Sequence, residues 1–142
     1  MTLGWTIPIL ADAIKELCDQ WGIKPIGVAD DACFSKHGHG SGSIADEFRH
    51  YGVMFTEAKK GDRRTGWEIM RRMLQDAGQL DKAGLYISRN CTYFWSTVPY
   101  LARDQKRMDD VDSSGPDHAA DACRYSLQRK QHVLREVKLT GA

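Results

Sequence analysis

A histidine and an aspartate three residues apart, His118 and Asp121, have the spacing in this chain that best suits chemistry. They fall near the start of a predicted helix, where a spacing of three puts both side chains on one face. Two more acids, Asp30 and Asp31, follow directly after the apolar run that ends at Ala29. Carboxylates from distant segments are typical ligands of Mg²⁺ or Mn²⁺ in sites that hydrolyse phosphodiesters. These residues therefore suggest a metal-dependent nuclease.

Each of these residues also has a structural interpretation. Scattered acids are commonly helix caps or solvated loop charges, and Asp117 fits a helix start that contains a proline. Asp121 lies past the first turn among alanines, which indicates a close-packed face. His118 could support a metal site or simply pack within the fold. Asp31 could take the role of Asp30, because the register at a strand end is not determined by sequence to one residue.

A basic segment is a candidate for contact with DNA phosphates. Its four cations are Lys59, Lys60, Arg63 and Arg64. Phosphate contact and an ordinary solvated face are equally good interpretations of such a segment. His37 and His39 alternate with glycines and offer only two donors, so a surface loop is favoured there over a zinc site. No G-x-x-x-x-G-K-[ST] motif occurs, so we expect no ATPase activity from this chain.

Length and composition limit the class of protein. The chain has 142 residues, of which 42% are hydrophobic and 27% are charged, as expected of one globular domain. The net charge of +1 argues against a wholesale nucleic-acid coat but allows a local basic groove. There is neither a transmembrane run nor a recognisable signal peptide, and the four cysteines are scattered, so we expect reduced thiols and a cytoplasmic location without a membrane partner.

The hydrophobic periodicity predicts an α/β fold over residues 1–142 as a single domain. Helices are expected at 9–21, 44–51, 65–76 and about 116–137, and strands at 25–30, 53–58 and 84–88. Strands alternating with helices in this way imply a mainly parallel sheet flanked by helices. Functional groups gather beyond the carboxyl ends of parallel strands, which is where Asp30 falls, and Asp121 could face it there.

Several segments, taken in order, resemble the nuclease domain of tailed-phage terminase large subunits. They are Ala29 to Ser35, Ser43 to Phe48, Asp62 to Trp67, Gly84 to Ser88, Thr97 to Pro99, Asp110 to Asp112 and Asp117 to Tyr125. Together they span about residues 9 to 130, nearly the whole chain. Each segment alone is weakly specific, whereas their order and spacing as a series are fairly specific.

The resemblance implies an RNase H-like fold and a two-metal endonuclease that cuts concatemeric viral DNA as phage heads are filled. Three acids hold the Mg²⁺ or Mn²⁺ ions in that family. Its second acid comes from a strand end and matches Asp30, and its third lies on the last helix and matches Asp121, with His118 beside it. The implied partners are double-stranded viral DNA, the portal and the terminase small subunit, in the cytoplasm of a bacterial host.

The chain also departs from the family. The first acid of the family lies on a strand that precedes the helix expected at 9–21, and this chain begins almost at that helix. Asp12 and Asp19 lie within the helix and cannot replace a strand carboxylate. We therefore expect a nuclease domain lacking the leading strands, with weak or no activity and a tendency to form homo-oligomers through an open sheet edge. The alternative is a non-catalytic DNA-binding or assembly module of a prophage remnant.

Overall fold

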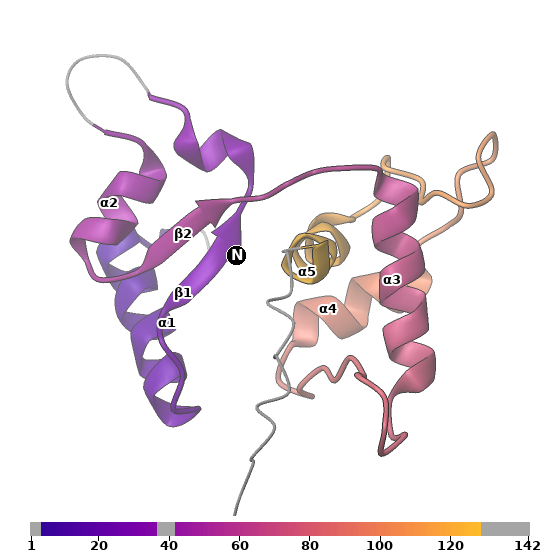
Figure 1. Cartoon of the computed structure of the whole chain (residues 1–142). Coiled ribbons are helices and arrows are strands. Elements are labelled where there is room, and N and C mark those ends of the chain that lie inside the picture. Colours follow the sequence, from indigo (N-terminus) through magenta and orange to yellow (C-terminus); the bar gives the residue numbers. More distant parts are fainter. Residues whose placement is uncertain (1–3, 37–41, 129–142) are drawn as a thin grey trace, which may run out of the picture.

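Two short parallel strands with helices around them make this a mixed α/β fold. The computed structural model describes residues 4–36 and 42–128 (Figure 1). The elements in order are α1 (Ile7–Gln20), β1 (Ile26–Ala29), the 3-10 turn η1 (Asp31–Phe34), α2 (Ile44–His50), β2 (Met54–Glu57), α3 (Arg63–Asp76), α4 (Thr92–Thr97), the 3-10 turn η2 (Val98–Tyr100) and α5 (His118–Gln128).

Local sequence explains where the first helices begin and end. Gly22 adopts a φ of +64° after α1, a conformation that glycine tolerates and that ends the helix where the sequence predicts. Ser43 caps α2: its hydroxyl accepts from the Asp46 N–H, and the Asp46 carboxylate accepts from the Ser43 N–H. The two bonds together form a capping box, a motif that the spacing of Ser43 and Asp46 allows. Asp62 likewise caps α3 by accepting from the Arg64 N–H at 3.1 Å.

The sheet is parallel, as predicted, and α2 lies in the connection between its strands. Ile26 pairs with Met54, and the register continues to the pair Ala29 and Glu57. Helices α1 and α2 lie on one side of the sheet, and α5 contacts β1 from the other side (Figure 1). On the α1 and α2 side, a core cluster of Ala11, Phe48 and Val53 packs against partly buried neighbours.

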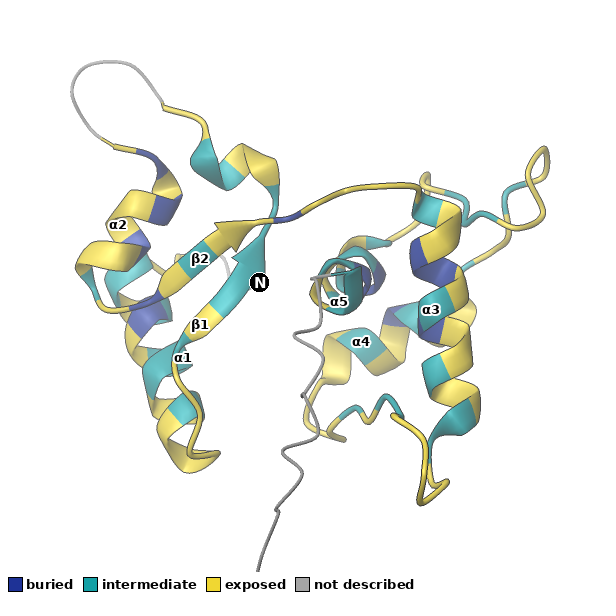
Figure 2. Ribbon diagram, viewed as in Figure 1, coloured by how far each residue is buried: buried dark blue, intermediate teal, exposed yellow. Residues whose placement is uncertain are grey.

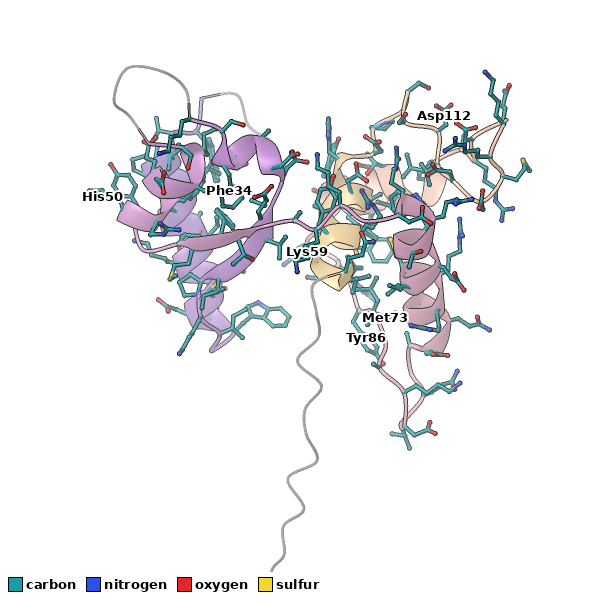
Figure 3. The ribbon with its side chains drawn as sticks, turned by 45° about the horizontal axis from the view of Figure 1, so that its top comes forward. Phe34, His50, Lys59, Met73, Tyr86 and Asp112 are labelled. Carbon is teal, nitrogen blue, oxygen red and sulfur yellow. The ribbon has the colours of Figure 1, made fainter. Side chains whose placement is uncertain are left out.

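A second core cluster lies in the C-terminal half of the chain. Trp67 and Met70 of α3 are buried against Ala120 of α5, as Figure 2 shows for these helices. Trp67 and Met70 are 4% and 5% exposed. A linker leads from β2 to α3, and Lys59 on it lies between the two halves in Figure 3. Helix α5 carries Ala120 of the second cluster and also contacts β1, so β1 lies close to the C-terminal half of the chain.

The third predicted strand, at 84–88, is wrong, because these residues are in neither a helix nor a strand. Their hydrogen bonds go elsewhere: the Leu85 N–H donates to the Met73 carbonyl at 2.9 Å, and the Gly78 N–H donates to the Tyr86 hydroxyl at 2.7 Å. Leu85 also packs against the second cluster. The apolar residues of this segment thus cover the end of α3 instead of extending a sheet.

Several predicted helix boundaries also change, and α1, for example, begins at Ile7 rather than at residue 9. Helix α3 begins at Arg63, two residues before its predicted start, because Asp62 supplies the cap. Helix α5 begins at His118 rather than at Pro116, and the predicted stretch 129–137 lies outside the described residues, as do His37 and His39. All four cysteines are free. In the described part of the chain, no helix has the length and apolar character needed to cross a membrane.

Candidate carboxylate site

Asp30, His118 and Asp121 line the same surface hollow. Asp30 follows the last residue of β1, at the carboxyl end of the strand where the sequence predicts a functional group. His118 opens α5, and Asp121 follows one turn later. The hollow has a volume of about 390 Å³, and Val28 and Tyr125 are also among its lining residues. The fold thus brings together segments that are far apart in the chain.

The Asp30 carboxylate has a partner on each oxygen. Oδ1 accepts from the Ala32 N–H at 3.0 Å, since Asp30 caps the 3-10 turn that follows. Oδ2 accepts from the Tyr125 hydroxyl of α5 at 3.3 Å. The backbone bond from Ala32 is the main reason that the pKa of Asp30 falls to about 2, and the neighbouring Asp31 and Lys60 add to the effect. Asp30 is therefore ionised throughout the physiological pH range.

Lys60 of the linker bridges the two neighbouring acids. Its Nζ lies 2.8 Å from Asp31 Oδ1 and 3.5 Å from Asp30 Oδ2. The contact with Asp31 raises the pKa of Lys60, and the charge of Asp30 adds to it, so the ammonium stays charged. Asp31 has the shorter contact with Lys60 and, unlike Asp30, is not among the residues that line the hollow.

Asp121 is held by a buried arginine of its own helix. Arg124, which is 2% exposed, donates to Asp121 Oδ1 from Nε at 3.2 Å and from Nη2 at 3.0 Å. Its Nη1 donates to the Lys60 carbonyl at 3.2 Å and to the Gln128 amide oxygen at 2.9 Å. The guanidinium also lies over the rings of Trp67 and Tyr125, at 5.2 and 4.6 Å from their centroids. Arg124 therefore fixes the orientation of Asp121.

The donor set does not suit a pair of divalent ions. Within the described ranges, 4–36 and 42–128, no three His, Cys, Asp or Glu side chains come together as a metal group. Both aspartates of the hollow also contact internal cations, Lys60 and Arg124. A metal pair needs several oxygen ligands whose charge is not already balanced in this way. Asp12 and Asp19 do not add ligands, since both lie within α1, and Asp12 pairs with Lys15 at 2.9 Å.

The basic segment does not form one free cationic surface. Lys60 pairs with Asp30 and Asp31, as described above. Arg63 lies 3.7 Å from Asp110 and 3.9 Å from Asp117. Arg64 pairs with Asp62 and Asp109. Among the described residues, Lys59 is the one cation of the four that has no carboxylate within 4 Å. The charge available for DNA phosphates is therefore much smaller than the sequence suggests.

Asp117 lies at the start of α5, as the sequence predicts, but its side chain turns toward Arg63 rather than into the hollow lining. The same arginine approaches Asp110, whose carboxylate accepts from the Trp67 indole N–H at 2.9 Å. Burial would raise the pKa of Asp110, but hydrogen bonds from the Val111 N–H and Trp67, together with Arg63, lower it overall. These contacts join the 104–117 segment to α3 and give this acidic group a structural role.

Sequence reasoning assigned no role to Arg124, Tyr125 or Gly66. A Cβ on Gly66 would lie 2.5 Å from Arg124 Cγ, so only glycine permits the present approach of α3 to α5. A glycine inside a strongly amphipathic helix was the available signal of this close approach. The i,i+3 spacing of Asp121 and Arg124 was the available signal of their pair, whereas the other partners of Arg124 and Tyr125 lie on the linker, on α3 and after β1 and gave no local signal.

Comparison with known protein families, curated proteins and solved structures found no match to this chain.

Proposed function

We propose that this chain is a nuclease domain of the terminase large subunit type, with a carboxylate site that is incomplete. On this proposal the fold is RNase H-like, and Asp30 and Asp121 correspond to two of the three metal-binding acids, with His118 beside them. The substrate is double-stranded viral DNA, and the portal and the terminase small subunit are the expected protein partners. The chain itself binds Mg²⁺ or Mn²⁺ weakly and cuts DNA poorly or not at all.

One observation carries this proposal: Asp30, His118 and Asp121 line a single hollow. The resemblance was based on separate segments of sequence, and nothing in their spacing requires the end of β1 to meet the start of α5. The position of Asp30 beyond a parallel strand, opposite an acid on the last helix, agrees with the expected arrangement. The small parallel sheet flanked by helices is compatible with an RNase H-like fold.

The partners of these acids support low activity. Metal-dependent cleavage of a phosphodiester needs carboxylates that place ions on the attacking and leaving oxygens. Here the two acids contact Lys60 and Arg124, and the described residues contain no group of three His, Cys, Asp or Glu side chains placed to hold a metal ion. The DNA-binding module, the alternative, draws less support, since three of the four cations of the basic segment have carboxylate partners.

A nicking assay combined with a metal titration tests the proposal. The purified chain should show little or no nicking of supercoiled plasmid with Mg²⁺ or Mn²⁺. It should bind Mn²⁺ with millimolar affinity by calorimetry, and Asp30→Asn and Asp121→Asn should each abolish this binding. Asp81→Asn is the matched control, because it removes the same charge from an exposed turn away from the hollow.

Two outcomes would contradict the proposal. Robust Mn²⁺-dependent nicking that disappears in Asp30→Asn would show that the site is complete and active. Absence of any Mn²⁺ binding, together with tight and salt-sensitive DNA binding in metal-free buffer, would instead favour the non-catalytic DNA-binding module.

A further inference from the structure

The charged groups around the hollow nearly balance one another. Three carboxylates (Asp30, Asp31 and Asp121) meet two internal cations (Lys60 and Arg124), and each of these cations contacts at least one of the acids at 3.5 Å or less. The protein therefore supplies positive charge at the place where the resemblance expects metal ions. Positive charge that is already present disfavours the entry of a further cation.

The two cations differ in how firmly they are held. The Arg124 side chain is buried and is bonded to Asp121, to Gln128 and to the Lys60 carbonyl. The Lys60 side chain is 47% exposed, and its ammonium contacts only the two neighbouring acids among the described residues. The Lys60 ammonium is therefore the cation that can move away from the carboxylates without unfolding the core.

The linker aims Lys60 at the acids. It runs from the end of β2 to the cap of α3, and the Ala58 N–H donates to the Ala29 carbonyl at 2.9 Å, next to Asp30. Arg124 Nη1 holds the Lys60 carbonyl at 3.2 Å. With the backbone anchored on both sides, the Lys60 ammonium is directed to the carboxyl end of β1. The ion pair thus follows from the path of the chain.

We propose that Lys60 is a built-in counter-cation that occupies the cation position beside Asp30 and Asp31 and thereby suppresses the binding of divalent metal. This inference rests on the proposed function, since it concerns the same carboxylates. A divalent ion that approaches Asp30 must displace the Lys60 ammonium or share the carboxylate with it. Removal of the positive charge should therefore strengthen metal binding, whereas removal of an ordinary supporting residue would weaken it.

The test is the Mn²⁺ affinity of Lys60→Gln, measured by calorimetry and by paramagnetic broadening of backbone amide signals. We expect Mn²⁺ to bind about thirtyfold more tightly than to the unaltered chain, because the repulsion between a divalent ion and an ammonium about 4 Å away is about 2 kcal/mol in water. The broadening should be greatest at Asp30 to Ala32. Added NaCl should reduce the difference, since it screens the repulsion. Lys60→Met, which keeps the aliphatic stem, should behave like Lys60→Gln.

Lys59→Gln is the matched control, because it removes the same charge at the neighbouring position. Among the described residues, the Lys59 side chain has no carboxylate within 4 Å. Its effect on Mn²⁺ affinity should be much smaller. Equal affinity in Lys60→Gln and the unaltered chain, with both bound at Asp30, would overturn the inference and leave the proposed function standing. No Mn²⁺ binding in any of these proteins would overturn both. Circular dichroism of each variant checks that it is folded.

Discussion

Asp30 is the residue at which sequence and structure agree best. It follows an apolar strand, its carboxylate accepts hydrogen bonds from Ala32 and Tyr125, and it forms an ion pair with the Lys60 ammonium. These partners come from the next turn, from α5 and from the linker, so the carboxylate contacts three parts of the chain. Cys33, close by, shows the opposite effect: burial and the charges of Asp30 and Asp31 raise the pKa of its thiol. The thiol therefore stays protonated and unreactive.

The titration of Asp30 should reflect these contacts. Its pKa is about 2, against an ordinary value of 3.8, chiefly because the folded backbone donates the Ala32 N–H to the carboxylate. Since folding lowers the pKa, Asp30 stabilises the fold at pH values above about 4, and this contribution is lost as the pH falls toward 2. Carboxyl ¹³C chemical shifts followed from pH 7 to pH 1.5 measure the pKa of Asp30. A midpoint at the ordinary value would mean that the Ala32 and Lys60 contacts do not persist in solution.

The packing of α3 against α5 depends on two residues of unequal size. Gly66 leaves room for the Arg124 stem, and the Arg124 guanidinium then lies over the Trp67 ring. Since Arg124 also holds Asp121 and the Lys60 carbonyl, this helix pair positions both the last helix and the linker. The candidate site is therefore built on a helix contact outside the sheet.

Gly66→Ala should destabilise the protein, although alanine is the better helix former. Helix propensity alone would give a gain of about 1 kcal/mol in the free energy of unfolding. The new Cβ would lie 2.5 Å from Arg124 Cγ, in a buried side chain that cannot swing away. Overpacking of this kind costs about 1–3 kcal/mol, so we expect a net loss of about 1 kcal/mol or more.

Urea denaturation monitored by tryptophan fluorescence measures this loss. Glu68→Ala, at an exposed position of the same helix, serves as the control and should change stability by less than about 0.5 kcal/mol. A stabilised Gly66→Ala protein would show that α3 and α5 do not approach this closely in solution.

The molecule as a whole leaves much apolar surface uncovered. The described sheet has only two strands, and a two-stranded sheet with open edges is weak by itself. Several apolar side chains of the N-terminal half are more than a third exposed, namely Ile9, Leu17, Trp21, Ile23, Ile26 and Met54. Ile26 and Met54 are paired neighbours in the sheet. Such a surface favours association with a second copy of the chain.

We therefore expect concentration-dependent self-association, measured by size-exclusion chromatography with light scattering. Met54→Lys should shift the equilibrium toward the monomer, because it places a charge on the exposed sheet surface. Leu80→Lys, which alters a fully exposed apolar residue of a distant turn, should leave the equilibrium unchanged. A monomer at millimolar concentration of the unaltered chain would count against this prediction.

Local signals in the sequence were enough for most of the elements. The periodic apolar residues of α1, α2 and α3, the Ser43 capping box and the stop at Gly22 act within a few residues of one another, so their outcome was predictable. The positions of Asp30 after a strand and of Asp121 on the last helix were predictable for the same reason. At 84–88 the local signal failed, because an apolar run does not specify whether it pairs with a strand or covers a helix end.

Contacts between distant segments decided the character of the candidate site. The pairing of Lys60 with Asp30 and Asp31, and of Arg124 with Asp121, sets the charge of the hollow. Carboxylate partners of Lys60, Arg63 and Arg64 likewise remove most of the free charge of the basic segment. The Arg124 pair has a local i,i+3 spacing within α5, but its burial, and the Lys60 pairs, depend on distances that are set by the path of the linker and by the packing of α5 against α3 and β1.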